Sequence, residues 1–258
     1  MTPEEKFTVD LEGYLVIKNV LSADEVAEMN AISEEKFPPP EDYEGGRRSV
    51  SRVSLWGPKF QALVDHPRIV PYLVELLGPK FRLDHDYCIF MRKTDDPKLR
   101  QAGSLHGGEV DHAGDHWYKY RDGVIRNGLS MFTFCLSDSK AGDGGFACIP
   151  GSHKSNFYAC IPSEVRRFER RPHYVVQPEA DAGDVIFFTE ALIHGTLPWT
   201  ADHERRAFLF KYSPGHSAWS QSYYDLDEFE NLTEQQKRIL APPSVGRRPN
   251  SVEAPTDV

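Results

Sequence analysis

The sequence of 258 residues predicts a mainly β protein, an antiparallel sandwich or barrel that follows a helical N-terminal region. Three observations predict this fold class. From Phe81 onward, apolar and polar residues alternate with a period of two, the period of a strand with one buried face. The chain contains 11 Tyr, 15 Phe, 19 Gly and 19 Pro, a composition that favours strands joined by turns. Long helices do not alternate with the strand candidates, which disfavours a doubly wound parallel sheet.

Helical signals dominate the first third of the chain. Ser22 and Glu25 form a capping box, and the helix that they open must end by Phe37 because three prolines follow. A second helix is expected over residues 67–77, where Gly78 would serve as the C-cap. These helices come before the region with a period of two, so we expect them to pack outside the sheets.

Strand signals begin with residues 13–18, a short segment rich in β-branched and aromatic residues. The polar, glycine-bearing stretch at residues 41–52 predicts a surface loop. The later strand candidates are bounded by Gly, Pro or Asp, as in an antiparallel sandwich or barrel. They lie at residues 81–92, 129–136, 146–149, 174–177, 185–189 and 207–212.

The C-terminal end combines a short helix with a tail. Thr233 opens this helix, and two consecutive prolines close it. We expect one domain over residues 1–240 and a Pro-rich tail over residues 241–258. The tail is polar from Ser244 onward, and we expect that part to be frayed.

Charge and hydropathy patterning exclude several classes of protein. The 39 acidic side chains outnumber the 30 basic ones, giving a net charge of −9, which repels phosphate backbones and argues against a nucleic-acid binder. No apolar run approaches the roughly 18 residues that cross a bilayer. The first residues lack the basic and apolar regions of a signal peptide. We therefore expect a soluble cytoplasmic protein that binds neither nucleic acid nor membrane.

The four cysteines do not indicate a disulfide framework or a structural zinc site. They are few and scattered, and no two of them form a Cys-x-x-Cys pair. Each is flanked by apolar or aromatic residues. We expect small buried hydrophobes at Cys88, Cys135, Cys148 and Cys160.

Two of the ten histidines stand apart by their setting. His106 follows a polar loop, and His194 is expected to end an apolar strand. Histidines at strand ends in a barrel point into its mouth, and two facing imidazoles make a minimal site for Fe, Zn, Cu or Ni. Arg205 follows His194 by eleven residues and could hold a carboxylate through two hydrogen bonds. We expect surface or packing roles for His66, His85, His173, His203 and His216.

In their order along the chain, several motifs together resemble the phytanoyl-CoA dioxygenase family. The resemblance runs from about residue 7 to about residue 214. Its most specific parts are a turn that ends in Gly-Ser-His-Lys and the interval from the distal His to an Arg. The residues that carry it are 13–17, His106, 142–146, 149–154, 194–196 and Arg205.

The resemblance implies a double-stranded β-helix, a cupin-like jelly roll of roughly eight core strands that holds Fe(II) and 2-oxoglutarate. In that family a His-x-Asp motif and a distal His bind the iron. By position, His106 is the first ligand, His194 is the distal one, and Arg205 binds the distal carboxylate of 2-oxoglutarate. Thr133 and Thr196 fall where the family places residues of the cosubstrate pocket, although both also suit ordinary strand positions.

Arg206 is the rival of Arg205. Adjacent residues of a strand face opposite ways, so only one of the two can point inward. The eleven-residue interval favours Arg205.

The chain departs from the family pattern at Gly108, where the family has Asp. Three interpretations follow. Related halogenases have Gly or Ala at this position, and chloride takes the place of the carboxylate. Glu109 or Asp111 could supply the carboxylate instead, because two glycines permit the backbone to change course. The third interpretation is a binding module without catalysis, because fold alone does not settle function.

The two histidines and Arg205 together argue against an inactive scaffold. The sequence therefore predicts a 2-oxoglutarate-dependent dioxygenase that hydroxylates or oxidises an unactivated C–H bond of a small molecule, with halogenation as the alternative. A coenzyme A site needs basic residues for its phosphates, and the acidic chain shows no such signature. The polar and aromatic loop at residues 111–122 is the expected place for substrate contacts.

Overall fold

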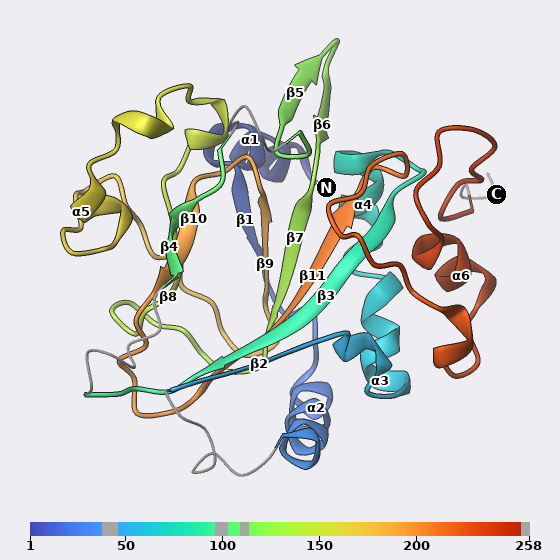
Figure 1. Ribbon diagram of the computed structural model, residues 1–258, viewed down its shortest axis with the longest axis horizontal. Coiled ribbons are helices and arrows are strands. Elements are labelled where there is room, and N and C mark those ends of the chain that lie inside the picture. Colours follow the sequence, from blue (N-terminus) through green and yellow to red (C-terminus); the bar gives the residue numbers. More distant parts are fainter. Residues whose placement is uncertain (38–45, 96–102, 109–113, 254–258) are drawn as a thin grey trace.

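The computed structural model describes residues 1–37, 46–95, 103–108 and 114–253. Two antiparallel sheets form its centre, as Figure 1 shows. The larger sheet has the strand order β1 (Tyr14–Ile17), β9 (Val185–Thr189), β7 (Ser130–Cys135), β11 (Arg205–Ser213), β3 (Arg82–Met91) and β2 (Arg47–Ser51). The smaller sheet has the order β4 (Gly103–His106), β10 (His194–Leu197) and β8 (Gly145–Cys148), and a separate hairpin pairs β5 (Tyr118–Arg121) with β6 (Val124–Asn127).

The two faces of the larger sheet pack against different parts of the protein. On β11, Phe208 and Phe210 point outward into a core shared with the helices, whereas Ala207 and Leu209 point toward the smaller sheet. The inner face and Phe146 of β8 form a second apolar cluster between the sheets. The mainly β, double-stranded β-helix architecture that the sequence predicts is confirmed.

Except for the short helix Ser163–Arg166, which packs beside β4 of the smaller sheet, the described helices cover the outer face of the larger sheet, as predicted for the N-terminal ones (Figure 1). The outer core includes Met29, Phe60, Leu73 and Ile239, which come from four different helices. The helices are α1 (Pro3–Glu12), α2 (Ala23–Lys36), α3 (Pro58–Gln61), α4 (Val70–Leu77), α5 (Ser163–Arg166) and α6 (Glu234–Leu240). Within the described ranges, none of them is both long and apolar enough to cross a membrane.

Two N-terminal elements differ from the expectation. Helix α1 was not predicted, although Thr2 and Glu5 form the same capping box that marks α2. Strand β2 occupies part of the expected loop at residues 41–52, because its backbone pairs with β3 while Arg48 packs on Phe90. Backbone pairing makes an edge strand from a polar sequence, which hydrophobic periodicity alone does not reveal.

Other expected boundaries also shift. The second helix, α4, begins at Val70 rather than at residue 67. The candidate strand at residues 174–177 is reduced to a single bridge between Val176 and Cys148. Cys160 is exposed, contrary to the expectation, whereas the other three cysteines are buried.

The chain between residues 244 and 253 packs on the domain instead of fraying. Ser251 and Arg248 are buried. The Arg248 guanidinium donates hydrogen bonds to the carbonyls of Pro242 (2.7 Å) and Arg238 (2.9 Å). A buried arginine that caps these carbonyls holds the segment against α6, a role that composition does not reveal.

Replacing Ser22 with Ala should lower the free energy of unfolding by about 1 kcal/mol. The Ser22 hydroxyl accepts a hydrogen bond from the Glu25 amide at 3.2 Å, and alanine leaves that donor without its protein partner. Urea denaturation followed by circular dichroism measures the change. Ser22→Asp, which retains an accepting oxygen, is the matched control. Equal losses in both variants would contradict the capping role.

Candidate metal and cosubstrate site

The site begins with the pairing of β4 and β10, which places His106 directly opposite His194. The two ring centroids lie 4.3 Å apart. Each ring is oriented through its Nδ1 atom, which lies 2.7 Å from the Ser104 carbonyl in His106 and 2.8 Å from the Leu192 carbonyl in His194. Because a carbonyl only accepts, these bonds place the hydrogen on Nδ1 and leave each Nε2 lone pair free. The facing pair of histidines expected from the sequence is therefore present.

Burial keeps His194 in the form that binds metals. Its exposed fraction is 6%, and burial lowers the pKa of its imidazole to about 4. Neutral imidazole is the metal-binding form of histidine. His106 lies at the exposed edge of β4.

A turn after β9 explains how His194 reaches this position. The expected apolar strand stops at Thr189, and His194 opens the next strand instead of ending the previous one. Gly107 packs against this turn so closely that a Cβ atom there would lie 2.5 Å from the Leu192 carbonyl oxygen. Gly107 has a φ of +87°, so both its space and its backbone conformation require glycine.

A cavity of about 200 Å³ lies between the sheets and contains both histidines. Arg205 lines it from β11 with an exposed fraction of 8%. Its guanidinium contacts the Met91 sulfur at 3.9 Å, and no carboxylate of the described chain pairs with it. Burial lowers the pKa of Arg205, but a guanidinium stays charged, so it offers an anion two parallel hydrogen bonds.

The remaining lining comes from both sheets. Thr133 and Thr196, for which the family resemblance implies a place in the cosubstrate pocket, line the same cavity. The other residues of the lining are Arg47, Tyr87, Ile89, Gly103, Met131, Phe146, Phe188, Gly195, Leu209 and Lys211. The cavity therefore combines an apolar wall with a few converging polar groups, the usual composition of a small-molecule site.

Arg206 points away from this cavity. Its guanidinium donates to Glu204 at 2.9 Å and to the Asn30 side chain at 3.1 Å, and it also pairs with Glu34 of α2. Arg205 is thus the inward-facing member of the adjacent pair, which agrees with the alternation of side chains along a strand.

A side chain at position 108 would not point toward the two histidines. A Cβ atom on it would meet Ile193 at 3.5 Å and Tyr158 at 4.0 Å, and would have no described atom of either histidine within 4 Å. The backbone φ of +85° would also strain any other residue. Glu109 and Asp111, the expected substitutes, lie outside the described residues, as does the start of the loop at residues 111–122. Among the described residues, no group of three or more His, Cys, Asp or Glu side chains is placed so that it could hold a metal ion.

No sequence motif identifies Glu190, a buried carboxylate in the turn between β9 and β10. Its exposed fraction is 2%, and its Oε2 atom lies 3.8 Å from Nε2 of His194 and 3.9 Å from Nε2 of His116. Its Oε1 atom lies 3.0 Å from the Lys211 ammonium. Burial by itself would raise the pKa of Glu190, but the Lys211 charge and the neighbouring histidines lower it to about 2. The one sign of Glu190 in the sequence is that a charged residue interrupts an otherwise apolar run.

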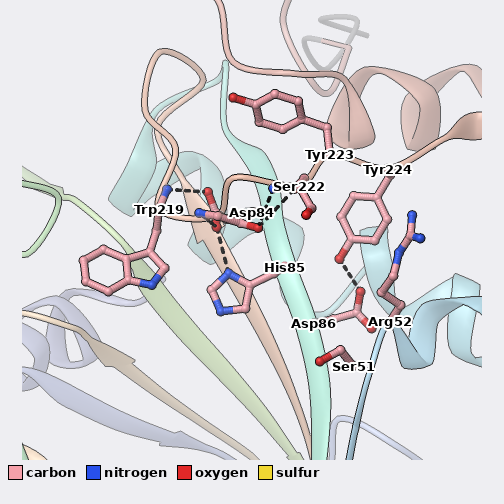
Figure 2. A pocket seen from close by; sticks show the side chains of 10 residues that line it. Ser51, Arg52, Asp84, His85, Asp86, Trp219, Ser222, Tyr223 and Tyr224 are labelled. Carbon is pink, nitrogen blue, oxygen red and sulfur yellow. Dashed lines mark hydrogen bonds and ion pairs between the residues drawn. The ribbon is translucent and has the colours of Figure 1, made fainter.

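A second cavity, of about 390 Å³, opens beside β3 and is shown in Figure 2. His85 lines it and stacks on Tyr87 of the first cavity, with ring centroids 5.9 Å apart. The two acids that line this second cavity, Asp84 and Asp86, already accept hydrogen bonds from other groups of the protein. Asp86 accepts a hydrogen bond from the Ser54 hydroxyl at 2.8 Å and another from the Tyr224 hydroxyl, the latter shown in Figure 2.

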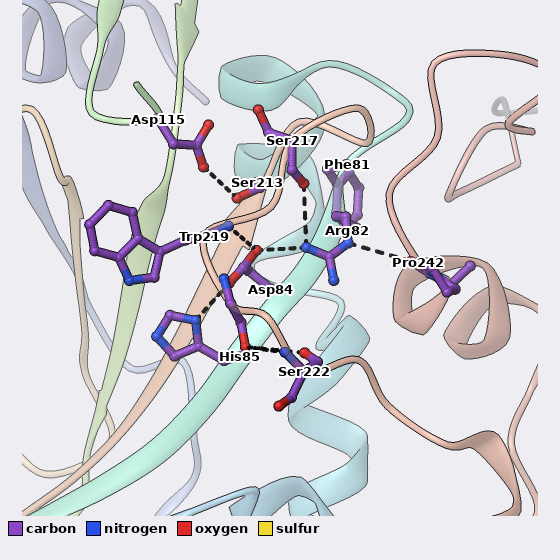
Figure 3. A network of polar contacts seen from close by, with 12 residues as sticks. Phe81, Arg82, Asp84, His85, Asp115, Ser213, Ser217, Trp219, Ser222 and Pro242 are labelled. Carbon is purple, nitrogen blue, oxygen red and sulfur yellow. Dashed lines mark hydrogen bonds and ion pairs between the residues drawn. The ribbon is translucent and has the colours of Figure 1, made fainter. Parts of the chain in front are cut away.

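Asp84 lies at the centre of the network in Figure 3, where it binds the backbone amide of Trp219 at 2.9 Å and the Arg82 guanidinium at 2.6 Å. This network is structural. It fixes Trp219, whose ring stacks on His116 at a centroid distance of 4.8 Å. The buried acids of the second cavity therefore position a neighbour of the candidate site and are not free to act on a ligand.

Comparison with known proteins identifies the family of the chain. A family model described as phytanoyl-CoA dioxygenase (PhyH) matches residues 9–207. The chain belongs to the phytanoyl-CoA dioxygenase family. The resemblance seen in the sequence is thereby confirmed, although no curated protein matches the chain.

Solved structures share the fold of this phytanoyl-CoA dioxygenase family member. HygX from Streptomyces hygroscopicus with iron bound is 25% identical, with a TM-score of 0.69 over 88% of this chain and 91% of that chain. The same protein with nickel and 2-oxoglutarate bound gives 24% identity and a TM-score of 0.71 over the same shares of the two chains. EctD from S. alaskensis is 19% identical, with a TM-score of 0.62 over 83% of this chain and 78% of that chain.

Proposed function

We propose that this protein is an Fe(II)- and 2-oxoglutarate-dependent oxygenase that hydroxylates or oxidises an unactivated C–H bond of a small molecule. The observation that carries the proposal is one cavity that combines two facing histidines, each with a free Nε2 atom, and a buried arginine without a carboxylate partner in the described chain. Membership of the phytanoyl-CoA dioxygenase family supports it, as do the metal and 2-oxoglutarate bound in HygX.

Each residue has a distinct role in this proposal. His106 and His194 hold the iron through Nε2, and their backbone-bonded Nδ1 atoms keep the rings in place. Arg205 binds the distal carboxylate of 2-oxoglutarate, while Thr133 and Thr196 line its pocket. When bound, the iron and 2-oxoglutarate together supply oxygen activation: the cosubstrate is oxidised to succinate and CO2, and the substrate is oxidised with it.

The proposed substrate is a small molecule. HygX has been solved with hygromycin B bound, which shows a small-molecule ligand in that protein. For this chain we infer only the class, because its net charge of −9 disfavours polyanions such as nucleic acid. The cytoplasmic location expected from the sequence stays a prediction.

Chloride binding has no support from the described site. Halogenation needs room for a halide where the family carboxylate stands. The side-chain direction at Gly108 leads instead toward Ile193 and Tyr158. The halogenase and the non-catalytic binding module therefore remain outcomes of the test rather than proposals.

The test is formation of succinate by the purified protein with Fe(II), 2-oxoglutarate, oxygen and a metabolite extract. We expect succinate to form only when iron and 2-oxoglutarate are both present, and the same product to form with or without chloride. The His194→Ala variant is the control for metal that is free in solution. Binding of 2-oxoglutarate without any succinate would favour the binding module. A chlorinated product would favour the halogenase.

A further inference from the structure

The cavity that contains His106 and His194 is lined by cations but by no acid of the described residues. Besides the two histidines, its charged lining consists of Arg47, Arg205 and Lys211. An uncompensated charge in a partly buried cavity is costly, so each of these cations needs an anionic partner. The partners of the three cations therefore indicate what the cavity binds.

Two of the three cations have an anionic partner. The Lys211 ammonium lies 3.0 Å from Oε1 of Glu190, a buried carboxylate that is not part of the lining. In the proposed function, Arg205 binds the distal carboxylate of 2-oxoglutarate, and the charge of the other carboxylate is balanced by the metal. Arg47 is left without an anionic partner among the described residues.

Backbone pairing places Arg47 and Arg205 on the same inner face of the larger sheet. Both lie directly opposite Met91 of β3, Arg47 from the edge strand β2 and Arg205 from β11. Residues paired across strands share a face, and neighbouring strands are spaced by about 4.8 Å, so the Cα atoms of the two arginines are about 10 Å apart. Each guanidinium can thus hold its own anion within one cavity.

The next residue on each of these strands is also an arginine but has a carboxylate partner. Arg48 and Arg206 point to the outer face, where their guanidiniums bind the same oxygen of Glu204 at 2.5 Å and 2.9 Å. The inward-facing arginines have no such carboxylate among the described residues. Burial lowers the pKa of Arg205, and the charge of Arg47 lowers it further, so the two inward charges repel each other until anions bind.

The position of Arg47 favours the substrate over the cosubstrate as its partner. Arg205 is 8% exposed, whereas Arg47 is half-buried on the edge strand of the sheet, where a ligand can reach it from solvent. One carboxylate already engages the two parallel donors of Arg205. A second guanidinium on that carboxylate would leave one positive charge uncompensated.

We propose that the substrate carries a carboxylate and that Arg47 binds it at the solvent-facing side of the cavity. The inference rests on the proposed function and names the class of its substrate. A guanidinium holds a carboxylate through two parallel hydrogen bonds and matches its single charge. A phosphate monoester carries a charge of about −1.5 to −2, which one guanidinium does not balance, so a carboxylate is the better match.

The first test supplies the full chain, Fe(II), 2-oxoglutarate and oxygen with a metabolite extract in two forms. One form is untreated, and in the other the carboxylates are converted to methyl esters before 2-oxoglutarate is added. We expect the untreated extract alone to raise succinate formation above the level without extract, and hydrolysis of the esters to restore it. Phosphatase treatment of the untreated extract should leave succinate formation intact. Activity with the esterified extract, or its loss after phosphatase treatment, would overturn the carboxylate assignment.

The second test measures how much extract and how much 2-oxoglutarate Arg47→Gln needs for half-maximal succinate formation. The extract requirement should rise at least about tenfold, because hydrogen bonds to a charged group are lost, whereas the 2-oxoglutarate requirement should stay unchanged. Arg92→Gln is the matched control, because Arg92 pairs with Glu204 and does not line the cavity. It should leave both requirements unchanged. A rise in the 2-oxoglutarate requirement alone would make Arg47 a cosubstrate residue and overturn the proposal.

These results also separate this proposal from the proposed function. If the esterified extract supports succinate formation, the substrate class is wrong and the oxygenase function stands. If neither form of the extract supports it, the proposed function fails and the proposal fails with it. Should Arg47→Gln not fold, the comparison of the two extracts with the unaltered chain decides the question.

Discussion

His106→Ala and His194→Ala should each weaken Fe(II) binding by more than about 100-fold, because each removes a ligand and outer partners alone contribute about 10–100-fold. The pairing of β4 and β10 places the two rings opposite each other, and no neighbouring residue of either strand occupies the same position to take over as a ligand. Anaerobic Fe(II) titration measures the affinity.

His173→Ala is the matched control, because the exposed His173 ring contacts Tyr174 and does not line the cavity. It should bind iron like the unaltered chain. Retention of tight iron binding in both His106→Ala and His194→Ala would show that the metal lies elsewhere.

Arg205→Ala should raise the concentration of 2-oxoglutarate needed for half-maximal succinate formation by about 100-fold or more. Each hydrogen bond to a charged group contributes about 1.5–3 kcal/mol, and the guanidinium offers two of them to one carboxylate. Arg205→Lys keeps the charge but loses the planar pair of donors, so we expect a smaller increase in the same direction.

Arg206→Lys is the control for this change. Arg206 pairs with Glu204 and Glu34 on the outer face of the sheet, so its replacement should leave the 2-oxoglutarate requirement unchanged. An unchanged requirement in both Arg205 variants would exclude Arg205 as the carboxylate anchor.

The sequence predicts the central strands well and the small sheet poorly, for a physical reason. β9 and residues 207–210 of β11 are apolar runs whose side chains fill two cores, so the strand signal is visible locally. β4 and β10 have four residues each and include polar ones. Their pairing is set by contacts between segments far apart in the chain, which no local window contains.

In the candidate site, too, some residues can be predicted from the sequence and others cannot. His106, His194 and Arg205 were found because the family motif has a recognisable order and spacing. The place of Glu190 could not be predicted, because only the turn between β9 and β10, and no motif, brings it next to His194. His116 was also missed, because only the packing on Trp219 reveals that a histidine in a polar loop is buried.

The most direct test of the whole account is anomalous diffraction from crystals grown anaerobically with Fe(II) and 2-oxoglutarate. We predict one iron peak between His106 and His194, within bonding distance of both Nε2 atoms, and 2-oxoglutarate with its distal carboxylate on Arg205. Iron bound away from these two histidines, or 2-oxoglutarate bound away from Arg205, would contradict the account.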